Sequence, residues 1–391
     1  MNLLTDIAIV GGGPIGLATA RAAAEFGVRT MVFERNPESS PPSCCTGLVS
    51  PRTLSTLGVS NDCVVQEIRA VSIHLPSGRQ INLRSNEVKA VVIDRKILET
   101  ELLLLLAREA GVDVQFDTEA VAAEQGKLTV RSGSVKQHIT ASIIVGADGP
   151  RSRVANWFSL GQPADFIAAA QVELEVKSCG PDQIDFFVGE DVAPGFFGWS
   201  VPAEDGILRV GLGVLPPHTP VTFLDRLLAE RYPDSRIRSR SAGWIPVSSA
   251  PRPATSGAIL VGDAAGHVKP LSGGGLYTGG TCARIAGETA ARVALSEAGA
   301  SELLATYSKR CLDAIGREQA FGCSIRHHLS RLRDEDLEVM AAALDNSQFL
   351  QFLADHADID YFHRLPDRLA SEPRLWTSII RLVPLLGSLI S

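Results

Sequence analysis

The chain has 391 residues, of which 45% are hydrophobic and 21% charged, and its formal net charge is −7. This composition is ordinary for a globular enzyme of two or three structural units, and no basic stripe indicates nucleic-acid binding. No uncharged apolar run reaches about 18 residues, so we expect no membrane span. The seven cysteines lack framework spacing and favour free thiols in a reducing compartment, so we expect a cytoplasmic protein.

A glycine-rich motif follows the first apolar run. Ile7–Val10 is typical of a buried parallel strand, and Gly11, Gly13 and Gly16 follow it as G-x-G-x-x-G. A helical pattern and a second strand, Thr30–Phe33, complete the strand–helix–strand unit of a dinucleotide fingerprint. Gly11 allows the tight turn, Gly13 the approach of a pyrophosphate, and Gly16 the close packing of helix on strand. The motif predicts a pyrophosphate at the N-terminus of this helix.

Three later features extend this prediction. Glu34 follows the second strand and is placed to accept a hydrogen bond from the adenosine ribose hydroxyls. A second glycine cluster lies within Gly262–Gly275, and Asp148-Gly149 stands between the two clusters. In this order the three motifs describe one FAD held at both ends.

The elements between these motifs alternate in type. Between residues 95 and 147 the pattern predicts a helix, a strand, a small β excursion and a strand that ends at Asp148-Gly149. From about Phe166 to Gly243, alternating apolar and polar residues predict an antiparallel sheet. Ala258–Val261 is again a buried strand, and the chain beyond residue 300 is mostly helical. The elements predicted before the antiparallel sheet are 95–110, 112–116, 120–130, 137–140 and 143–147.

We therefore predict an α/β protein with a Rossmann-type FAD-binding domain, an inserted antiparallel β-sheet substrate domain and a helical C-terminal region. The FAD-binding domain is expected to be discontinuous, because its motifs lie in separated parts of the chain. The predicted ranges are 1–70, 91–160 and 250–300 for the FAD-binding domain, 71–90 and 161–249 for the substrate domain, and 301–391 for the C-terminal region.

The order of these motifs resembles that of the flavoproteins built like p-hydroxybenzoate hydroxylase. Arg95 matches the arginine that these proteins place near the cofactor, and Asp263 matches the carboxylate that accepts a hydrogen bond from a ribityl hydroxyl. The resemblance implies that the backbone of Ser272–Gly275, at the start of a helix over Leu276–Ala290, faces the flavin pyrimidine. A helix N-terminus there would stabilise negative charge on reduced flavin.

Within that group the chain most resembles the geranylgeranyl reductase family. Gly266 stands where hydroxylases of this fold usually carry histidine, and the loop Pro41–Leu48 resembles the family's cysteine-containing loop. Phe196–Pro202, followed by Gly211–Gly213, is similar to an aromatic element on the family's substrate-facing sheet. Val201, where the pattern prefers Phe, and the doubled cysteine depart from the family.

The resemblance implies a reductase that saturates double bonds of an isoprenoid chain, with hydride from reduced flavin and a proton from a loop cysteine. Cys45 fits the C-x-G spacing better than Cys44, but buried structural thiols are the common alternative, and a vicinal disulfide is a third. The rival enzyme is an FAD-dependent monooxygenase or halogenase acting on an apolar small molecule, and a third reading is a lipid-binding flavoprotein with structural FAD. The electron donor is left open between NAD(P)H and a ferredoxin-like protein.

Several residues have two interpretations. Phe197 and Trp199 share a strand face with Val201 and either wall an apolar tunnel or fill the core. His267 either faces the flavin edge or bonds a neighbouring backbone group. The apolar segment 375–386 either packs on the protein or touches a membrane surface, which leaves peripheral membrane contact open.

The candidate site residues fall into three groups. Cys45 and Cys44 are the catalytic candidates, and no metal site is expected, because His327 and His328 are adjacent and lie on different helix faces. The substrate-binding candidates are Phe197, Trp199, Pro202 and His267. The cofactor-binding candidates are Gly11, Gly13, Pro14, Ile15, Gly16, Glu34, Arg35, Arg95, Asp148, Gly149, Gly262, Asp263, Gly273, Gly274 and Gly275.

Overall fold

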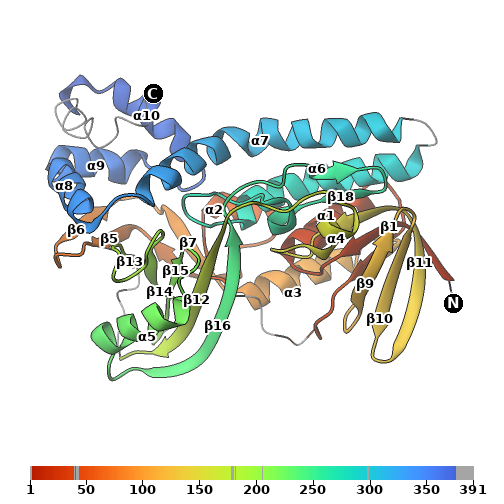
Figure 1. The fold of residues 1–391 in the computed structure, drawn as a ribbon, viewed down its shortest axis with the longest axis horizontal. Helices are drawn as coiled ribbons and strands as arrows, with labels where there is room; N and C mark the ends of the chain where they lie inside the picture. The colour runs from red at the N-terminus through yellow and green to blue at the C-terminus, as the bar shows by residue number, and fades with distance from the viewer. Residues whose placement is uncertain are drawn as a thin grey trace.

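The structure is a computed structural model that describes residues 2–38, 40, 44–177, 180, 182–204, 206–296 and 299–375. The predicted fold class is confirmed. A largely parallel sheet, an antiparallel sheet and a helical C-terminal region succeed one another across the molecule (Figure 1). The first three residues of the cysteine-containing loop Pro41–Leu48, residues 41–43, lie outside the described residues.

The first sheet carries the nucleotide-binding motifs. Its central strands β1, β2, β8, β11 and β18 run parallel in the order β18-β11-β1-β2-β8. Ile7, Ala8 and Ile9 of β1 are fully buried, as expected for a parallel strand covered on both faces. The strands of this sheet within the described residues are β1 Asn2–Val10, β2 Thr30–Phe33, β8 Val112–Gln115, β9 Glu119–Glu124, β10 Lys127–Ser132, β11 Val135–Gly146, β17 Ala254–Thr255 and β18 Ala258–Leu260.

The two strands predicted at 137–140 and 143–147 form one strand, β11. Its first half pairs antiparallel with β10, and nearly its whole length pairs parallel with β1, from His138 opposite Asn2 to Gly146 opposite Val10. The hydrogen bonds to β1 therefore continue through the residues between the two predicted strands. The pattern of side chains missed this continuity because only the first half has an exposed face.

The second sheet is mostly antiparallel and has the order β16-β12-β15-β14-β13-β5-β6. Its described strands are β5 Ala70–His74, β6 Gln80–Arg84, β12 Phe166–Glu175, β13 Gln183–Phe187, β14 Gly198–Pro202, β15 Ile207–Val214 and β16 Arg236–Pro246. A third, small sheet consists of β3 Leu48–Val49, β7 Ala90–Ile93 and β4 Val64–Ile68. Its strand order is β3-β7-β4. The predicted domain boundaries stay a prediction.

Helices cover the first sheet and form the C-terminal region. The long helix α7 runs from the first sheet toward the C-terminal helices, with α6 alongside it (Figure 1). The α-helices are α1 Pro14–Ala24, α2 Pro51–Leu57, α3 Arg95–Leu106, α4 Arg153–Trp157, α5 Pro220–Arg231, α6 Leu276–Leu295, α7 Ala300–Leu329, α8 Asp334–Leu344, α9 Ser347–His356 and α10 Leu365–Ala370. Short 3₁₀ helices are η1 Gly262–Ala265, η2 Phe362–Arg364 and η3 Pro373–Leu375.

Helices α1 and α6 approach each other closely through a glycine. A methyl group built on Gly287 of α6 would lie 2.5 Å from the carbonyl oxygen of Thr19 and 2.7 Å from Cβ of Ala22, both on α1. These distances leave no room for a side chain. The contact matters because α1 begins at the first glycine motif and α6 begins at the second.

We expect Gly287→Ala to lower the free energy of unfolding by about 1–3 kcal/mol, the usual cost of overpacking a core. Alanine is the better helix former, so the sign reports the contact between α1 and α6 rather than helix propensity. Urea denaturation measures the difference, with Gly180→Ala as the control, since a methyl group at Gly180 meets nothing within 4 Å. Equal stability of the two variants would contradict the close contact.

Candidate functional site

The first glycine loop is closed by backbone contacts that exclude side chains. Gly11 has φ +108°, and a methyl group on it would lie 2.2 Å from the carbonyl oxygen of Ala147 at the end of β11. A methyl group on Gly16 would lie 2.0 Å from the carbonyl oxygen of Gly11. Both glycines are therefore required by the packing of α1 on the sheet, as the sequence predicts.

Gly13 differs, because it borders open space. It is the N-cap of α1, and a methyl group on it would meet nothing within 4 Å. Pro14 opens the helix, no side chain caps it, and its first turn carries no acid. The free amide groups and the helix dipole at this point favour an anion.

Glu34 orders the loop beside Gly13. Its carboxylate accepts hydrogen bonds from the amide of Gly12 at 2.8 Å and from the amide and side chain of Asn36 at 2.9 and 2.8 Å. A carboxylate has about four acceptor positions, so it retains capacity for a ribose hydroxyl. Arg35 is exposed directly after it.

The second motif places a buried carboxylate at the start of α6. A methyl group on Gly275, the N-cap of α6, would lie 2.9 Å from Oδ1 of Asp263. Burial raises the pKa of Asp263 to about 6, and the nearby Arg95 guanidinium opposes this rise. No hydrogen bond from the described residues reaches the Asp263 carboxylate, so the group is left for another donor.

Ile15 joins the two motifs. Methyl groups on Gly262 and Gly279 would each lie 2.9 Å from side-chain atoms of Ile15, which is the second residue of α1. The start of α1 therefore packs directly on η1 and α6. This contact brings the two glycine motifs, far apart in sequence, to one place.

The polar groups gathered here fit FAD. The N-termini of α1 and α6 both lack side-chain caps, Nε of Arg95 is buried without a hydrogen-bond partner, and Asp263 accepts no hydrogen bond from described residues. Buried polar groups are normally paired, so these groups indicate a ligand with both donors and acceptors. The adenine dinucleotide and flavin ring of FAD offer both.

The two cysteines point to different partners. Sγ of Cys45 accepts a hydrogen bond from the Gly47 amide at 3.4 Å, and it lies near enough to the Arg95 guanidinium for the two to interact electrostatically. Cys44 faces β16 near Ser241 and Gly243, and burial raises the pKa of its thiol. Cys45 thus shares Arg95 with Asp263, whereas Cys44 lies toward the antiparallel sheet.

Arg95 is held between acidic groups. Burial alone would lower its pKa, but the neighbouring Cys45 and Glu99 side chains raise it above the usual arginine value. Glu99 forms an ion pair with it one helical turn along α3. The guanidinium is therefore a fixed positive charge beside Cys45.

Asp148 serves the protein itself. Its carboxylate accepts hydrogen bonds from Ser152 Oγ at 2.6 Å and from the amides of Arg153 and Val154 at 2.7 and 3.2 Å, where α4 begins. Asp148 thus binds the first turn of α4, whose N-cap is Ser152. A methyl group on Gly149 meets nothing within 4 Å, so of the predicted pair it is Gly149 whose backbone borders open space.

Aromatic side chains of the antiparallel sheet extend toward the second glycine loop. Phe196 and Phe197 stack with ring centroids 4.3 Å apart, and Phe186 meets Phe197 edge-on at 5.1 Å. A methyl group on Gly273 would lie 3.6 Å from Cζ of Phe196. The half-buried phenylalanines therefore form an apolar surface that reaches the loop at Gly273.

Trp199 is buried at the end of this cluster. Its indole N–H donates to Oε1 of Gln171 at 3.1 Å, and Nε2 of Gln171 donates to the carbonyl of Cys45 at 3.2 Å. Trp199 is buried, as expected for a residue of the core rather than of a tunnel wall. Phe197 is only partly buried. Pro202 ends β14 and is buried.

His267 lies in the core. Burial lowers its pKa to about 4, and its Nδ1 has no hydrogen-bond partner. Donor atoms of His267, Cys282 and Cys311 lie within 4.8 Å of one another. Both thiols are free, and each shifts the pKa of the other: the pKa of Cys282 is raised well above its usual value, and that of Cys311 is lowered.

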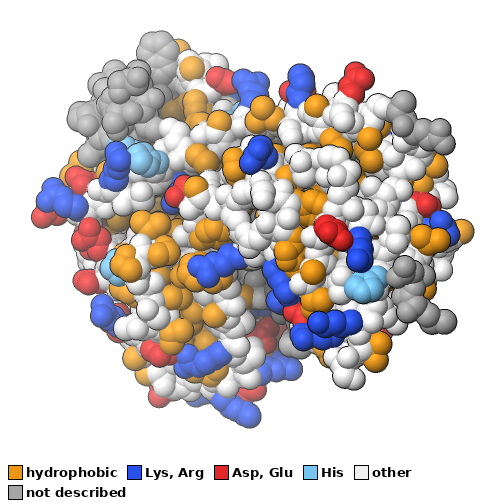
Figure 2. All heavy atoms as spheres, turned by 45° about the vertical axis from the view of Figure 1, so that its right-hand side comes forward, with side chains coloured by type: hydrophobic (Ala, Val, Ile, Leu, Met, Phe, Trp, Pro, Cys, Tyr) orange, Lys and Arg blue, Asp and Glu red, His pale blue; other side chains and the backbone are white. Residues whose placement is uncertain are grey.

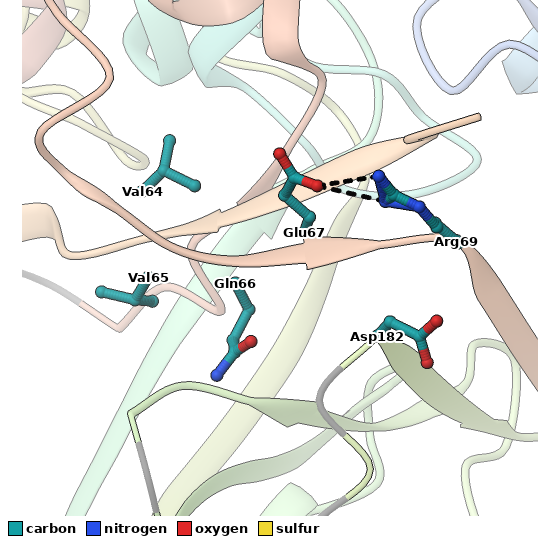
Figure 3. A pocket seen from close by; sticks show the side chains of 6 residues that line it. All are labelled: Val64, Val65, Gln66, Glu67, Arg69 and Asp182. Carbon is teal, nitrogen blue, oxygen red and sulfur yellow. Dashed lines mark hydrogen bonds and ion pairs between the residues drawn. The ribbon is translucent and has the colours of Figure 1, made fainter. Parts of the chain in front are cut away.

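A groove elsewhere on the surface does not belong to this site. It is an open groove of about 530 Å³ along β4, lined by Val64, Val65, Gln66, Glu67, Arg69 and Asp182. Gln66 and Glu67 point to opposite sides of the strand, and Glu67 forms an ion pair with Arg69 (Figure 3). Charged side chains make this groove unsuitable for an apolar chain.

The comparisons with known proteins agree with this geometry. The FAD binding domain family matches residues 4–215. The chain is 31% identical to the digeranylgeranylglycerophospholipid reductase of Methanothrix thermoacetophila over 87% of its length and 91% of the relative. It is 32% identical, with the same two coverages, to the second such reductase of Methanothermobacter thermautotrophicus. This chain belongs to the geranylgeranyl reductase family of FAD-dependent oxidoreductases.

Solved structures show the same fold more widely. A geranylgeranyl bacteriochlorophyll reductase-like protein of Thermoplasma acidophilum aligns with a TM-score of 0.84 at 23% identity, covering 98% of this chain and 100% of that one. The p-nitrophenol 4-monooxygenase of Pseudomonas putida DLL-E4 aligns with a TM-score of 0.65 at 18% identity, covering 90% and 99%. The predicted cofactor, FAD, is confirmed for this flavoenzyme.

The distribution of charge on the surface does not indicate a binding face. On the face drawn in Figure 2, acidic and basic side chains of the described residues are interspersed with apolar ones. Within the described ranges, no helix combines the length and apolarity needed to cross a membrane. The segment 375–386 lies outside the described residues from Trp376 onward, and peripheral membrane contact stays a prediction.

Sequence reasoning missed the residues that act through long-range hydrogen bonds. Gln171 links Trp199 to Cys45, and Arg209 donates to the carbonyls of Thr46 and Ile93 at 2.9 and 3.1 Å. Both lie on strands whose alternation predicts only a sheet. The position of Arg209 within an apolar strand was the one signal in the sequence, and it does not indicate which groups the arginine binds.

We expect Gly13→Val to abolish FAD retention, because the new side chain enters the open space before the N-terminus of α1. Flavin absorbance after gel filtration measures retention, and thermal unfolding of the variant shows that it folds. Normal flavin content in the folded variant would contradict the placement of the pyrophosphate here.

A second prediction concerns pH. Because the pKa of Asp263 is higher in the folded state, ionisation of this carboxyl group opposes folding. The stability contributed by the protonated group is fully present below the usual pKa of 3.8 and is lost as pH rises through about 6. In FAD-free protein, Asp263→Asn should therefore raise the melting temperature above pH 6 and leave it unchanged below pH 4. A melting-temperature difference that is the same at every pH would show that the ionised carboxylate carries no such cost.

Proposed function

We propose that this flavoenzyme saturates double bonds of an isoprenoid chain and that Cys45 donates the proton. The names of the curated relatives support the substrate class, since they are reductases of digeranylgeranylglycerophospholipid. The observation that supports the proton donor is the electrostatic interaction of Cys45 with the Arg95 guanidinium, whose charge also acts on Asp263. A thiol in this position would lie on the cofactor side of its loop.

FAD, when bound in its reduced form, supplies the hydride for one carbon of the double bond. The other carbon needs a proton from a positioned acid. Cys45 would donate it, and the Arg95 guanidinium would stabilise the thiolate left behind, because a neighbouring cation favours the ionised thiol. The amide of Gly47, 3.4 Å from Sγ, adds a second donor to the thiolate.

The loop that carries Cys45 is fixed from the antiparallel sheet. Gln171 holds the Cys45 carbonyl, and Arg209 holds the next carbonyl, that of Thr46. Arg209 is 9% exposed, so its hydrogen bonds act in a region of low water content. These two residues are proposed to position the thiol rather than to touch the substrate.

The apolar chain is proposed to lie on the phenylalanine surface. Phe186 belongs to β13, Phe196 and Phe197 lie directly before β14, and Phe196 reaches Gly273 of the second glycine loop. An apolar surface that meets the flavin-facing loop would hold a hydrocarbon against the reacting atoms. Trp199 would support this surface from the core.

We expect Cys45→Ala to retain FAD and flavin reduction but to lower alkene reduction on the order of 10²-fold, the usual effect of one positioned acid. The measurement is single-turnover oxidation of dithionite-reduced enzyme by a geranylgeranyl lipid without oxygen. Cys44→Ala is the matched control and should have the smaller effect, since Cys44 faces Ser241 rather than Arg95.

Three outcomes would contradict the proposal in different ways. If both variants match the parent, the cysteines are structural and another group donates the proton. If Cys44→Ala has the larger effect, the thiol facing β16 is the donor. If the parent fails with every prenyl lipid yet hydroxylates or halogenates an apolar compound with oxygen, the enzyme is a monooxygenase or halogenase.

A further inference from the structure

Lys269 is a buried lysine that closes the second glycine loop. Its amide donates to the carbonyl of Gly274 at 3.0 Å, and its carbonyl accepts from the amide of Gly273 at 2.8 Å. These two hydrogen bonds fold residues 269–274 into a compact turn directly before α6. The backbone of Lys269 therefore fixes the loop that is proposed to face the flavin pyrimidine.

The side chain of Lys269 runs back along the same loop. A methyl group on Gly274 would lie 3.0 Å from Cε and 3.4 Å from Nζ of Lys269, so the ammonium group lies against this glycine. Beyond it, Nζ donates to the carbonyl of Ile359 and to Oδ1 of Asp360, each at 2.8 Å. The side chains of Lys269 and Asp360 are 7% and 0% exposed.

Asp360 comes from the C-terminal region, 91 residues further along the chain. Its Oδ2 is buried without a hydrogen bond, and the nearest further cation is Arg52, with NH1 3.7 Å away. Arg52 itself is engaged by Asp358, which accepts from it at 2.9 and 3.0 Å. Lys269 is thus the direct partner of Asp360, and Asp358 is the partner of Arg52.

We propose that Lys269 and Asp360 are a positioning pair that holds the flavin-facing loop and sets its charge. The proposal rests on the proposed orientation of Ser272–Gly275 toward the flavin pyrimidine. A buried ammonium next to Gly274 would favour the negative charge of reduced flavin, and the Asp360 carboxylate offsets that effect. Because neither group is exposed to water, removing one leaves the charge of the other uncompensated.

The test is the midpoint potential of FAD-loaded enzyme. Asp360→Asn should raise the potential and Lys269→Met should lower it, each changing the ratio of reduced to oxidised enzyme on the order of tenfold at a fixed potential. For a two-electron couple, tenfold corresponds to about 30 mV. The double variant should return near the parent, and Lys269→Arg should stay near it because it keeps the charge.

Asp358→Asn is the matched control. It removes the charge of a carboxylate that pairs with Arg52 instead of Lys269, while asparagine keeps the oxygen that accepts from the Asp360 amide, so the potential should stay unchanged. If both single variants move the potential in the same direction, or neither moves it, the pair does not set the charge of the loop and the proposal is wrong. If both single variants lose FAD, recovery of FAD in the double variant supports the pair, and no recovery overturns it.

A further variant distinguishes failure of the proposed loop orientation toward the flavin from failure of the Lys269–Asp360 pair. Gly274→Pro removes an amide donor from the loop and should lower the potential if the loop faces the flavin. An unchanged potential in the folded, FAD-loaded Gly274→Pro variant would overturn the orientation and the pair together. A lowered potential there, with unmoved Lys269→Met and Asp360→Asn variants, would overturn the pair alone.

Discussion

The close contact between α1 and α6 is the constraint on which the cofactor site depends. Gly287 allows the helices to touch, and Ile15 fills the space between Gly262 and Gly279. Because each helix begins at a glycine motif, their packing sets the distance between the two uncapped N-termini. A dinucleotide held at both ends needs that distance to be fixed before it binds.

Several polar groups at the site lack hydrogen-bond partners or have a shifted pKa in the protein without its cofactor. Asp263 has a raised pKa, Arg95 has an unpaired Nε, and both helix N-termini lack side-chain caps. Each group carries a desolvation cost that its own chain does not offset. FAD binding would satisfy these groups, so cofactor affinity and the instability of the empty site have the same physical origin.

The antiparallel sheet contributes to the same site by holding the cysteine loop. Gln171 and Arg209 bind carbonyls at Cys45 and Thr46, and Phe196 reaches Gly273 on the other side. The C-terminal region adds Asp360, which binds Lys269 beneath the loop. Three parts of the chain therefore meet where the chemistry is proposed, and the redox and proton-transfer roles come from different parts.

The sequence by itself determined the fold class and the FAD cofactor, because glycine spacing and strand periodicity are local and can be recognised without knowledge of distant partners. The resemblance of local motifs to those of the geranylgeranyl reductases determined the family. It also placed Cys45 ahead of Cys44 from the C-x-G spacing. The tertiary structure alone decided that His267 is buried beside two thiols, that Gln171 binds the carbonyl of Cys45, and that Lys269 binds Asp360. Those arrangements depend on contacts between residues far apart in the chain, and a side chain's type does not specify which distant group folding will bring to it.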